Sequence, residues 1–271
     1  MSQFIKSIKH GWQRKNSLVC VGLDPDLSRL PPHLLEQPNP VFEFCRQIVD
    51  QTHDLVCAYK PQIAYFADQG VEDQLAQIID YIHRQYPGVP VILDAKRGDI
   101  GSTAARYALE AFERFKADAV TINPYMGKDS AQPFLDYADK GVVILCRTSN
   151  AGGADLQDLD CNSVPLYQHV ARQVSETWNT NNNCCLVVGA TWPQQMAQVR
   201  AIVGDMPLLV PGVGTQGGDV KALLEAGLSK AGDGLIINSA RAIIFASQGV
   251  DFATAARQAT LELRDQINLY R

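Results

Sequence analysis

The chain has 271 residues, 46% of them hydrophobic, which is enough for one large core. Its 24 basic and 29 acidic residues give a net charge of −5, so it lacks the basic field that attracts nucleic acid or an anionic membrane. No apolar run approaches the roughly 20 residues of a transmembrane helix, and the start lacks the apolar core of a signal peptide. We therefore expect a cytoplasmic protein whose seven cysteines stay reduced.

Short apolar runs recur along the whole chain, and each is followed by a segment with helical periodicity. The runs are residues 17–23, 55–60, 89–95, 118–123, 142–146, 185–190, 207–212 and 234–239. Their near-continuous valine, isoleucine and leucine content is typical of strands that are covered on both faces. Helices are expected between them, among others at 41–53, 71–86, 102–116, 164–178, 193–203 and 251–270.

This alternation of strands and helices predicts an α/β fold of the (β/α)8 TIM-barrel type, with residues 1–271 in a single domain. The alternative is an open doubly wound sheet, which usually carries a G-x-G-x-x-G motif after its first strand, whereas the first run here ends in GLDPD. One long polar insertion, 150–163, follows the fifth run. On a barrel this insertion lies on the catalytic face, where it can act as a lid.

The sharpest polar cluster is DAKRGDIGST, which directly follows the third apolar run. Asp94 and Lys96 are two residues apart, so on an extended chain both side chains point to the barrel mouth. Asp99 and Thr103 lie on the turn into the next helix and can face the mouth or an interface. The alternatives are a rim salt bridge for the first pair and a helix N-cap for Asp99.

Lys60 ends the second run and is followed by a proline that forbids simple continuation of the strand ladder. Because the second and third strands of a barrel are neighbours, Lys60 can pair with Asp94. Carboxylates at close range offset the desolvation of a lysine, so the lysine stays protonated and can deliver a proton. The alternative is a rim lysine that extends its head into solvent.

A phosphate site is predicted at the last two strands, where PGVGTQGGD and NSARAI emerge. Gly212 and Gly214 allow backbone N–H groups to approach an anion, a helix N-terminus follows, and Arg241 adds a bidentate charged contact. This is where the barrel fold commonly binds phosphate. The alternative is a tight connection without a ligand.

Weaker signals follow the fifth and first runs. Thr148 or Ser149 can hydrogen-bond an amide-like base edge, and Asp24 can accept from a ribose hydroxyl, although each is also compatible with turn chemistry. The histidines offer no metal-ligand spacing, and we expect no metal; they are His10, His33, His53, His83 and His169.

The run from Asp94 to Thr103 resembles the D-x-K-x-x-D-I-x-x-T signature of orotidine 5'-phosphate decarboxylases. Lys60, PGVGTQGGD and Arg241 fall where that family has its other functional positions, so the resemblance spans essentially the whole chain. NPYMG, RTSN and GATWPQQ look like the longer bacterial-type subfamily. The resemblance implies conversion of orotidine 5'-monophosphate to uridine 5'-monophosphate without metal or cofactor.

The same resemblance implies a charged tetrad of Lys60, Asp94, Lys96 and Asp99, with Asp99 contributed across the interface of a homodimer. Lys96 would protonate C6, and Asp94 would sit against the substrate carboxylate. The binding residues implied are Asp24 and Thr103 for the ribose, Ser149 for the pyrimidine, and Gln216 with Arg241 for the phosphate.

Two other functions remain open at this point. Sugar-phosphate barrels such as 3-keto-gulonate-phosphate decarboxylases and hexulose-phosphate synthases share the D-x-K-x-x-D element, but they need a further carboxylate to hold Mg²⁺, and after the second run this chain offers Lys60 instead. The other is a phosphate-binding barrel without catalysis, whose charged residues would be rim salt bridges.

Overall fold

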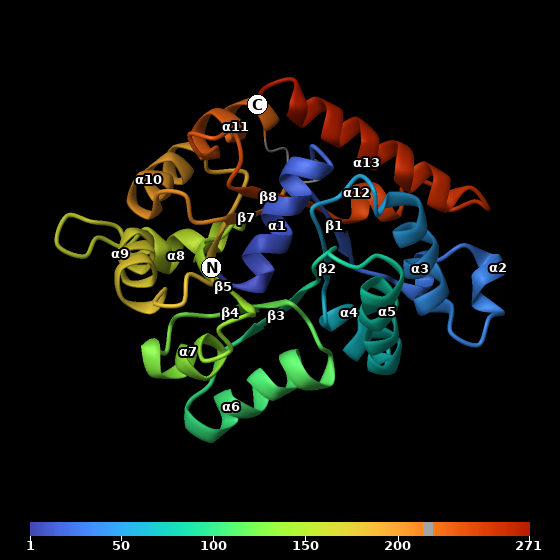
Figure 1. The fold of residues 1–271 in the computed structure, drawn as a ribbon, viewed down its shortest axis with the longest axis horizontal. Coiled ribbons are helices and arrows are strands. Elements are labelled where there is room, and N and C mark those ends of the chain that lie inside the picture. The colour runs from blue at the N-terminus through green and yellow to red at the C-terminus, as the bar shows by residue number, and fades with distance from the viewer. Residues whose placement is uncertain (214–218) are drawn as a thin grey trace.

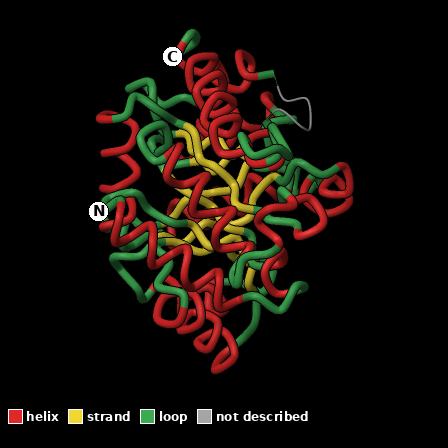
Figure 2. The backbone as a smooth tube through the Cα atoms, turned by 90° about the vertical axis from the view of Figure 1, so that its right-hand side faces the viewer, coloured by secondary structure: helices red, strands yellow, loops and turns green. Residues whose placement is uncertain are grey.

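Eight parallel strands form one closed sheet in the computed structural model, which describes residues 1–213 and 219–271. The strand order is β2-β1-β8-β7-β6-β5-β4-β3, and parallel bridges from Tyr59 to Val91 and from Gln62 to Asp94 join its two ends. The strands lie at the centre and the helices surround them (Figures 1 and 2). The predicted (β/α)8 barrel is confirmed, and the closed sheet excludes the open doubly wound alternative.

The eight strands all begin or end within a few residues of the predicted runs. They are β1 (Val19–Leu23), β2 (Ala58–Pro61), β3 (Ile92–Arg97), β4 (Ala119–Ile122), β5 (Gly141–Arg147), β6 (Cys184–Val188), β7 (Leu208–Pro211) and β8 (Leu235–Ser239). Almost every strand residue is buried, as expected for strands packed against side chains of the barrel interior on one face and against helices on the other.

The six predicted helices are present, together with shorter ones. The α-helices are α1 (Gln3–Arg14), α2 (Pro32–Leu35), α3 (Pro40–Thr52), α4 (Ala64–Ala67), α5 (Glu72–Gln85), α6 (Gly101–Leu109), α7 (Lys128–Leu135), α8 (Ala154–Gln157), α9 (Leu166–Gln173), α10 (Pro193–Val203), α11 (Val220–Gly227), α12 (Arg241–Ile244) and α13 (Phe252–Asn268). Helices α6 and α9 continue into π-helical turns, η2 (Glu110–Arg114) and η4 (Val174–Trp178), while η1 (Leu27–Arg29) and η3 (Ala151–Gly153) are 3₁₀ turns.

Helix α1 was not anticipated from the sequence, and it covers the amino-terminal end of the barrel (Figure 1). The Ser2 hydroxyl caps the helix by accepting from the Ile5 N–H, at 3.3 Å. A Cβ built on Gly141, at the start of β5, would lie only 2.2 Å from the Phe4 ring, so this strand needs glycine where the helix packs. Helix α1 therefore covers the end of the barrel opposite to the carboxyl ends of the strands.

Two general expectations can be compared with the described residues. Within residues 1–213 and 219–271, no helix is both long and apolar enough to cross a membrane. The seven cysteines are free, and all are buried except the partly exposed Cys161. The predicted use of cysteine as a small buried hydrophobic side chain therefore fits six of the seven positions.

Candidate active site

A cavity of about 430 Å³ opens at the carboxyl ends of the strands. Lys60 of β2 and both Asp94 and Lys96 of β3 line one side of it. Its apolar wall comes from β5, β6 and β7, through Leu145, Val187 and Leu209. The cavity therefore places a row of charges beside an apolar surface, at the end of the barrel where this fold holds its active sites.

Asp94 lies between two ammonium groups. Its Oδ2 accepts from Lys60 Nζ at 2.8 Å, and its Oδ1 accepts from Lys96 Nζ at 2.7 Å. The Lys60 and Asp94 residues are only 4% and 7% exposed, whereas the Lys96 side chain is 47% exposed. The predicted Lys60–Asp94 pair is therefore present and buried, and Lys96 is the member of the cluster that a ligand can reach.

The cluster fixes the charge of its buried members. Burial alone would raise the pKa of Asp94, but Lys60 and Lys96 outweigh it and hold that pKa well below its usual range. Burial likewise opposes the charged form of Lys60, yet Asp94 and Asp24 raise the pKa of this lysine above its ordinary value. At neutral pH Asp94 is therefore a carboxylate and Lys60 an ammonium group, not a neutral pair.

The backbone of β3 departs from the extended geometry that the sequence suggested. The pairing between β3 and β4 shifts register between Leu93 and Arg97, and Lys96 has a positive φ of 47°. Both side chains face the cavity, as expected from the sequence, but the strand that carries them is not regular. The two side chains meet because the strand bulges, a feature that a two-residue spacing does not reveal.

Two residues after β5 also line the cavity. Thr148 uses its hydroxyl to donate to Asn150 Oδ1 at 2.7 Å, and it also accepts from Gln157 Nε2 at 2.9 Å. No hydrogen bond to the Ser149 hydroxyl is found among the described residues. The backbone of Ser149 packs closely on Gly189. A Cβ built on Gly189 would lie 2.6 Å from Ser149 Cα.

The segment predicted as a lid folds over this side of the cavity. The residues of this segment that line the cavity include Asn150, which precedes η3, Gly152 of η3, and Leu156 and Gln157 of α8. Gln157 Oε1 accepts from the Thr148 N–H at 2.8 Å and ties α8 to the end of β5. The insertion therefore lies on the catalytic face, as expected.

Arg147 holds the same segment from beneath, and the sequence reasoning did not single it out. This residue is fully buried; its Nη2 donates to Asp158 at 2.9 Å, and its guanidinium lies 4.1 Å from the Trp192 ring centroid. The Trp192 indole N–H donates to the Thr148 carbonyl at 3.0 Å. A basic residue at the last position of an apolar strand was the available signal.

Asp24 follows β1 on the same side of the barrel. Its Oδ1 is buried and has no hydrogen-bond partner among the described residues, although the residue as a whole is partly exposed. Burial raises the pKa of Asp24, while Lys60, Lys96 and Arg241 counteract this effect. A buried carboxylate oxygen without a donor is unfavourable unless a ligand supplies one.

The predicted phosphate site is described only in part. Gly212 follows β7 with a φ of 98°, a left-handed conformation that favours glycine. Arg241 begins α12 directly after β8, and its side chain is exposed. Gly214 and Gln216 lie outside the described residues.

Asp99 and Thr103 do not line the cavity. Asp99 is partly exposed in the turn between β3 and α6, where its carboxylate accepts from the Ile100 N–H at 2.7 Å, and Thr103 is exposed on α6. The residue at the N-cap of α6 is Ile100, so Asp99 does not cap this helix. Of the four residues of the implied tetrad, the structure thus brings together Lys60, Asp94 and Lys96 within one chain.

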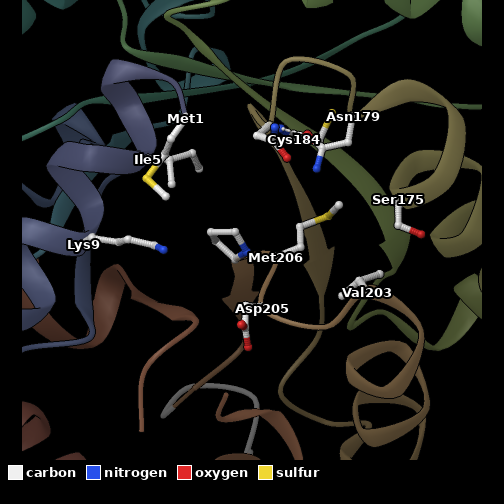
Figure 3. Close-up of a pocket in the computed structure, with 11 residues that line it drawn as sticks. Met1, Ile5, Lys9, Ser175, Asn179, Cys184, Val203, Asp205 and Met206 are labelled. Carbon is white, nitrogen blue, oxygen red and sulfur yellow. Dashed lines mark hydrogen bonds between the residues drawn. The ribbon is translucent and has the colours of Figure 1, made fainter. Parts of the chain in front are cut away.

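A second cavity, of about 370 Å³, lies at the amino-terminal end of the barrel, between α1, η4 and the start of β7 (Figure 3). Lys9 and Asp205 border it together with apolar side chains such as Ile5 and Met206. It lies at the other end of the barrel from the lysine and carboxylate cluster, because Cys184 is the first residue of β6 and Pro207 immediately precedes β7. The candidate active site is therefore the cavity at the carboxyl ends.

Within residues 1–213 and 219–271, no group of three or more histidine, cysteine or acidic side chains is placed to hold a metal ion. The fold and site define a class: a (β/α)8 barrel that places a buried carboxylate between two lysines beside a cavity at the carboxyl ends of its strands. Comparison with known proteins identifies the family within that class.

Residues 17–258 match the orotidine 5'-phosphate decarboxylase / HUMPS family. The orotidine 5'-phosphate decarboxylase of Azoarcus sp. (strain BH72) is 62% identical over 268 residues, and that of Ralstonia pickettii (strain 12J) is 62% identical over 269, each match covering 99% of both chains. The structure of Leishmania donovani OMP decarboxylase has a TM-score of 0.86 at 40% identity, covering 100% of this chain and 99% of that chain. The chain therefore belongs to the orotidine 5'-phosphate decarboxylase / HUMPS family, and the resemblance inferred from its signature is confirmed.

Proposed function

We propose that this enzyme decarboxylates orotidine 5'-monophosphate to uridine 5'-monophosphate in pyrimidine biosynthesis, with Lys96 as the proton donor. The observation that carries the proposal is the buried Asp94 carboxylate, held at 2.8 Å and 2.7 Å between Lys60 and Lys96 at the edge of the cavity. The 62% identity to orotidine 5'-phosphate decarboxylases over nearly the full length supports the reaction itself.

In the proposed step, the bond between C6 and the carboxylate breaks and CO2 leaves, while the electron pair stays on C6. The Lys96 side chain is 47% exposed whereas that of Lys60 is 6% exposed, so the Lys96 ammonium can approach C6, stabilise the carbanion and transfer a proton. Asp94 would stand next to the departing carboxylate and repel it in the ground state. Lys60 keeps Asp94 ionised throughout.

The remaining contacts extend from this centre. We assign the pyrimidine edge to Ser149, because its hydroxyl is uncommitted among the described residues while that of Thr148 is engaged with Asn150 and Gln157. The unpartnered Oδ1 of Asp24 fits an acceptor for a ribose hydroxyl.

Arg241 and the backbone at Gly212 would bind the phosphate, together with Gly214 and Gln216. Because the phosphate is remote from the bond that breaks, its binding energy can serve to close the site over the base.

A homodimer would complete the site. Asp99 and Thr103 stand outside the cavity of their own chain, and the neighbouring Ile100 is 56% exposed, as is expected of a surface that a second copy covers. We propose that Asp99 and Thr103 reach the site of the partner. We also propose a cytoplasmic location, which the free cysteines support.

The test follows the ultraviolet absorbance of orotidine 5'-monophosphate with protein treated with EDTA, comparing wild type with Lys96→Ala. Lys116→Ala is the matched control, since Lys116 is also a lysine with a positive φ, of 56°, but is exposed away from the cavity. We expect turnover by wild type and the control, and a loss of at least about 1,000-fold in Lys96→Ala.

Three outcomes would contradict the proposal. Activity lost with EDTA and restored by Mg²⁺ would show that the reaction depends on a metal, contrary to the proposed mechanism. Full activity of Lys96→Ala would remove the proton-donor role. A folded wild type that binds phosphate without turnover would favour a barrel that only binds its ligand.

The shared site is tested by mixing two inactive variants, Lys96→Ala and Asp99→Ala. If Asp99 acts across the interface, a mixed dimer has one site with both defects and one intact site, so an equal mixture recovers roughly a quarter of wild-type activity. No recovery after subunit exchange has been verified by mass would contradict the placement of Asp99 in the partner's site.

A further inference from the structure

The bulge in β3 is filled by a side chain of β4, Thr121. The register pairs Leu93 with Val120 and next pairs Arg97 with Ile122, so three residues of β3 stand opposite one residue of β4. Regular pairing resumes where the Asn123 N–H donates to the Arg97 carbonyl at 2.8 Å. The three residues of this irregular segment, from Asp94 to Lys96, include the carboxylate and the exposed lysine of the cluster.

The Thr121 hydroxyl replaces the missing ladder at this point. It accepts from the N–H groups of Ala95 and Lys96, both at 2.9 Å, and it donates to Asp94 Oδ1, also at 2.9 Å. Thr121 is 1% exposed. Since a hydroxyl has one proton and two lone pairs, these bonds use its full capacity and leave it one orientation.

These contacts link the backbone of Lys96 to the carboxylate that binds its side chain. Asp94 Oδ1 accepts hydrogen bonds from both the Thr121 hydroxyl and the Lys96 ammonium. The backbone N–H of Lys96 donates to the same hydroxyl, and the residue has a left-handed conformation with a φ of 47°. A non-glycine residue keeps such a conformation only where its surroundings fix it. A threonine that merely satisfied buried backbone would not need its proton on the carboxylate of the site.

We propose that Thr121 is a positioning residue for decarboxylation, which sets the place of the Lys96 ammonium through the bulge and through Asp94. This proposal rests on the function proposed above. Without the hydroxyl, the two bulge N–H groups lose their acceptor and the segment relaxes toward a different register. Lys96 then stands away from C6, although the pocket for the nucleotide is intact.

The test compares Thr121→Val, which keeps the shape and removes the hydroxyl, with Thr121→Ser, which keeps the hydroxyl. Thr260→Val is the control, because Thr260 is a buried threonine on α13 whose hydroxyl donates to the Ala256 carbonyl at 2.7 Å. We expect kcat of Thr121→Val to fall about 100-fold with KM within about threefold of wild type. Thr121→Ser keeps kcat within about fivefold, and Thr260→Val has wild-type kcat.

Binding of uridine 5'-monophosphate and thermal unfolding are measured for each variant, so that loss of the fold is recognised. If Thr121→Val does not fold, Thr121→Ala takes its place with the same expected split between kcat and KM. The proposal is overturned if the variant without the hydroxyl keeps kcat within about threefold, or if Thr121→Ser is equally impaired.

Wild type and Lys96→Ala are assayed in the same series to separate the two proposals. An inactive wild type or an active Lys96→Ala contradicts the proposed function. An active wild type, an inactive Lys96→Ala and an active Thr121→Val contradict only the role of Thr121.

Discussion

Replacing Asp94 by asparagine removes the negative charge from a buried ion pair and keeps the shape of the side chain. Lys60 is 4% exposed, and its Nζ lies 2.8 Å from Asp94 Oδ2. At an effective dielectric constant of about 20, this separation corresponds to roughly 6 kcal/mol of attraction, part of which is spent on desolvating both groups. Removing one partner of such a pair typically costs about 3–5 kcal/mol, and we expect Asp94→Asn to lower the free energy of unfolding by that amount.

Replacing the other partner of the pair, Lys60, is expected to destabilise the protein less. In Lys60→Met, Asp94 keeps Lys96 at 2.7 Å and the Thr121 hydroxyl at 2.9 Å, so its charge is still compensated. We expect a loss of about 1–2 kcal/mol for Lys60→Met, and a loss for the double variant that is at least about 2 kcal/mol smaller than the sum of the two.

Urea unfolding at pH 7 measures all four proteins of this cycle. Single losses that add to the double loss within about 0.5 kcal/mol would refute the coupling between the two residues. An equal cost for the two single variants would contradict the expected difference between them.

The pH dependence of stability provides a second test of the same ion pair. Because the folded-state pKa of Asp94 lies below its ordinary value of about 3.9, its contribution is complete above that value and is lost as the pH falls through the folded-state pKa. The difference in stability between wild type and Asp94→Asn is therefore constant from about pH 5 to 8 and shrinks below about pH 4. A difference that grew on acidification would contradict the assignment.

Three further predictions concern other parts of the site. Burial raises the pKa of Asp24, so its charged form costs stability as the pH rises above about 4, the ordinary pKa of this carboxyl. Asp24→Asn should therefore raise the free energy of unfolding at pH 7 while lowering kcat/KM, and a lower melting temperature would contradict this. Gly189→Ala places a Cβ 2.6 Å from Ser149 Cα and should raise KM at least about tenfold in steady-state assays; an unchanged KM would remove Ser149 from the base contact. Ellman's reagent should titrate only Cys161 rapidly in the native protein and all seven cysteines in denaturant, and several fast thiols would show that the helices open.

Much of the barrel could be predicted from the sequence because each unit repeats a simple pattern. Strand β6 is an unbroken apolar run and β5 is apolar up to its last residue, while helices such as α10 begin at a proline and show one apolar face. The pairing of Lys60 with Asp94 followed from the adjacency of β2 and β3 in a closed barrel. Neither inference needed information about side-chain packing.

The features that were missed depend on contacts between distant segments. Helix α1 has a clear apolar face, but only its packing on the start of β5 shows that it covers the barrel end. Thr121 is a single polar residue in a buried strand, and its proposed role depends on a register shift that no local pattern encodes. Asp99 lies outside the cavity of its own chain, and its proposed role in the site of a partner would depend on a contact between chains that no local pattern encodes.

The bulge gives a physical reason for the placement of Lys96. On a regular strand, residues two apart have Cα atoms about 6.6 Å apart and nearly parallel side chains, so an ammonium would be free to move above a neighbouring carboxylate. Here the left-handed backbone of Lys96 costs about 1–2 kcal/mol, which the hydrogen bonds to Thr121 and the ion pair with Asp94 can offset. The local rule for strands is broken at Lys96, the residue proposed to hold a proton beside a developing carbanion, and the cost of that departure is met by neighbours that keep the ammonium in one place.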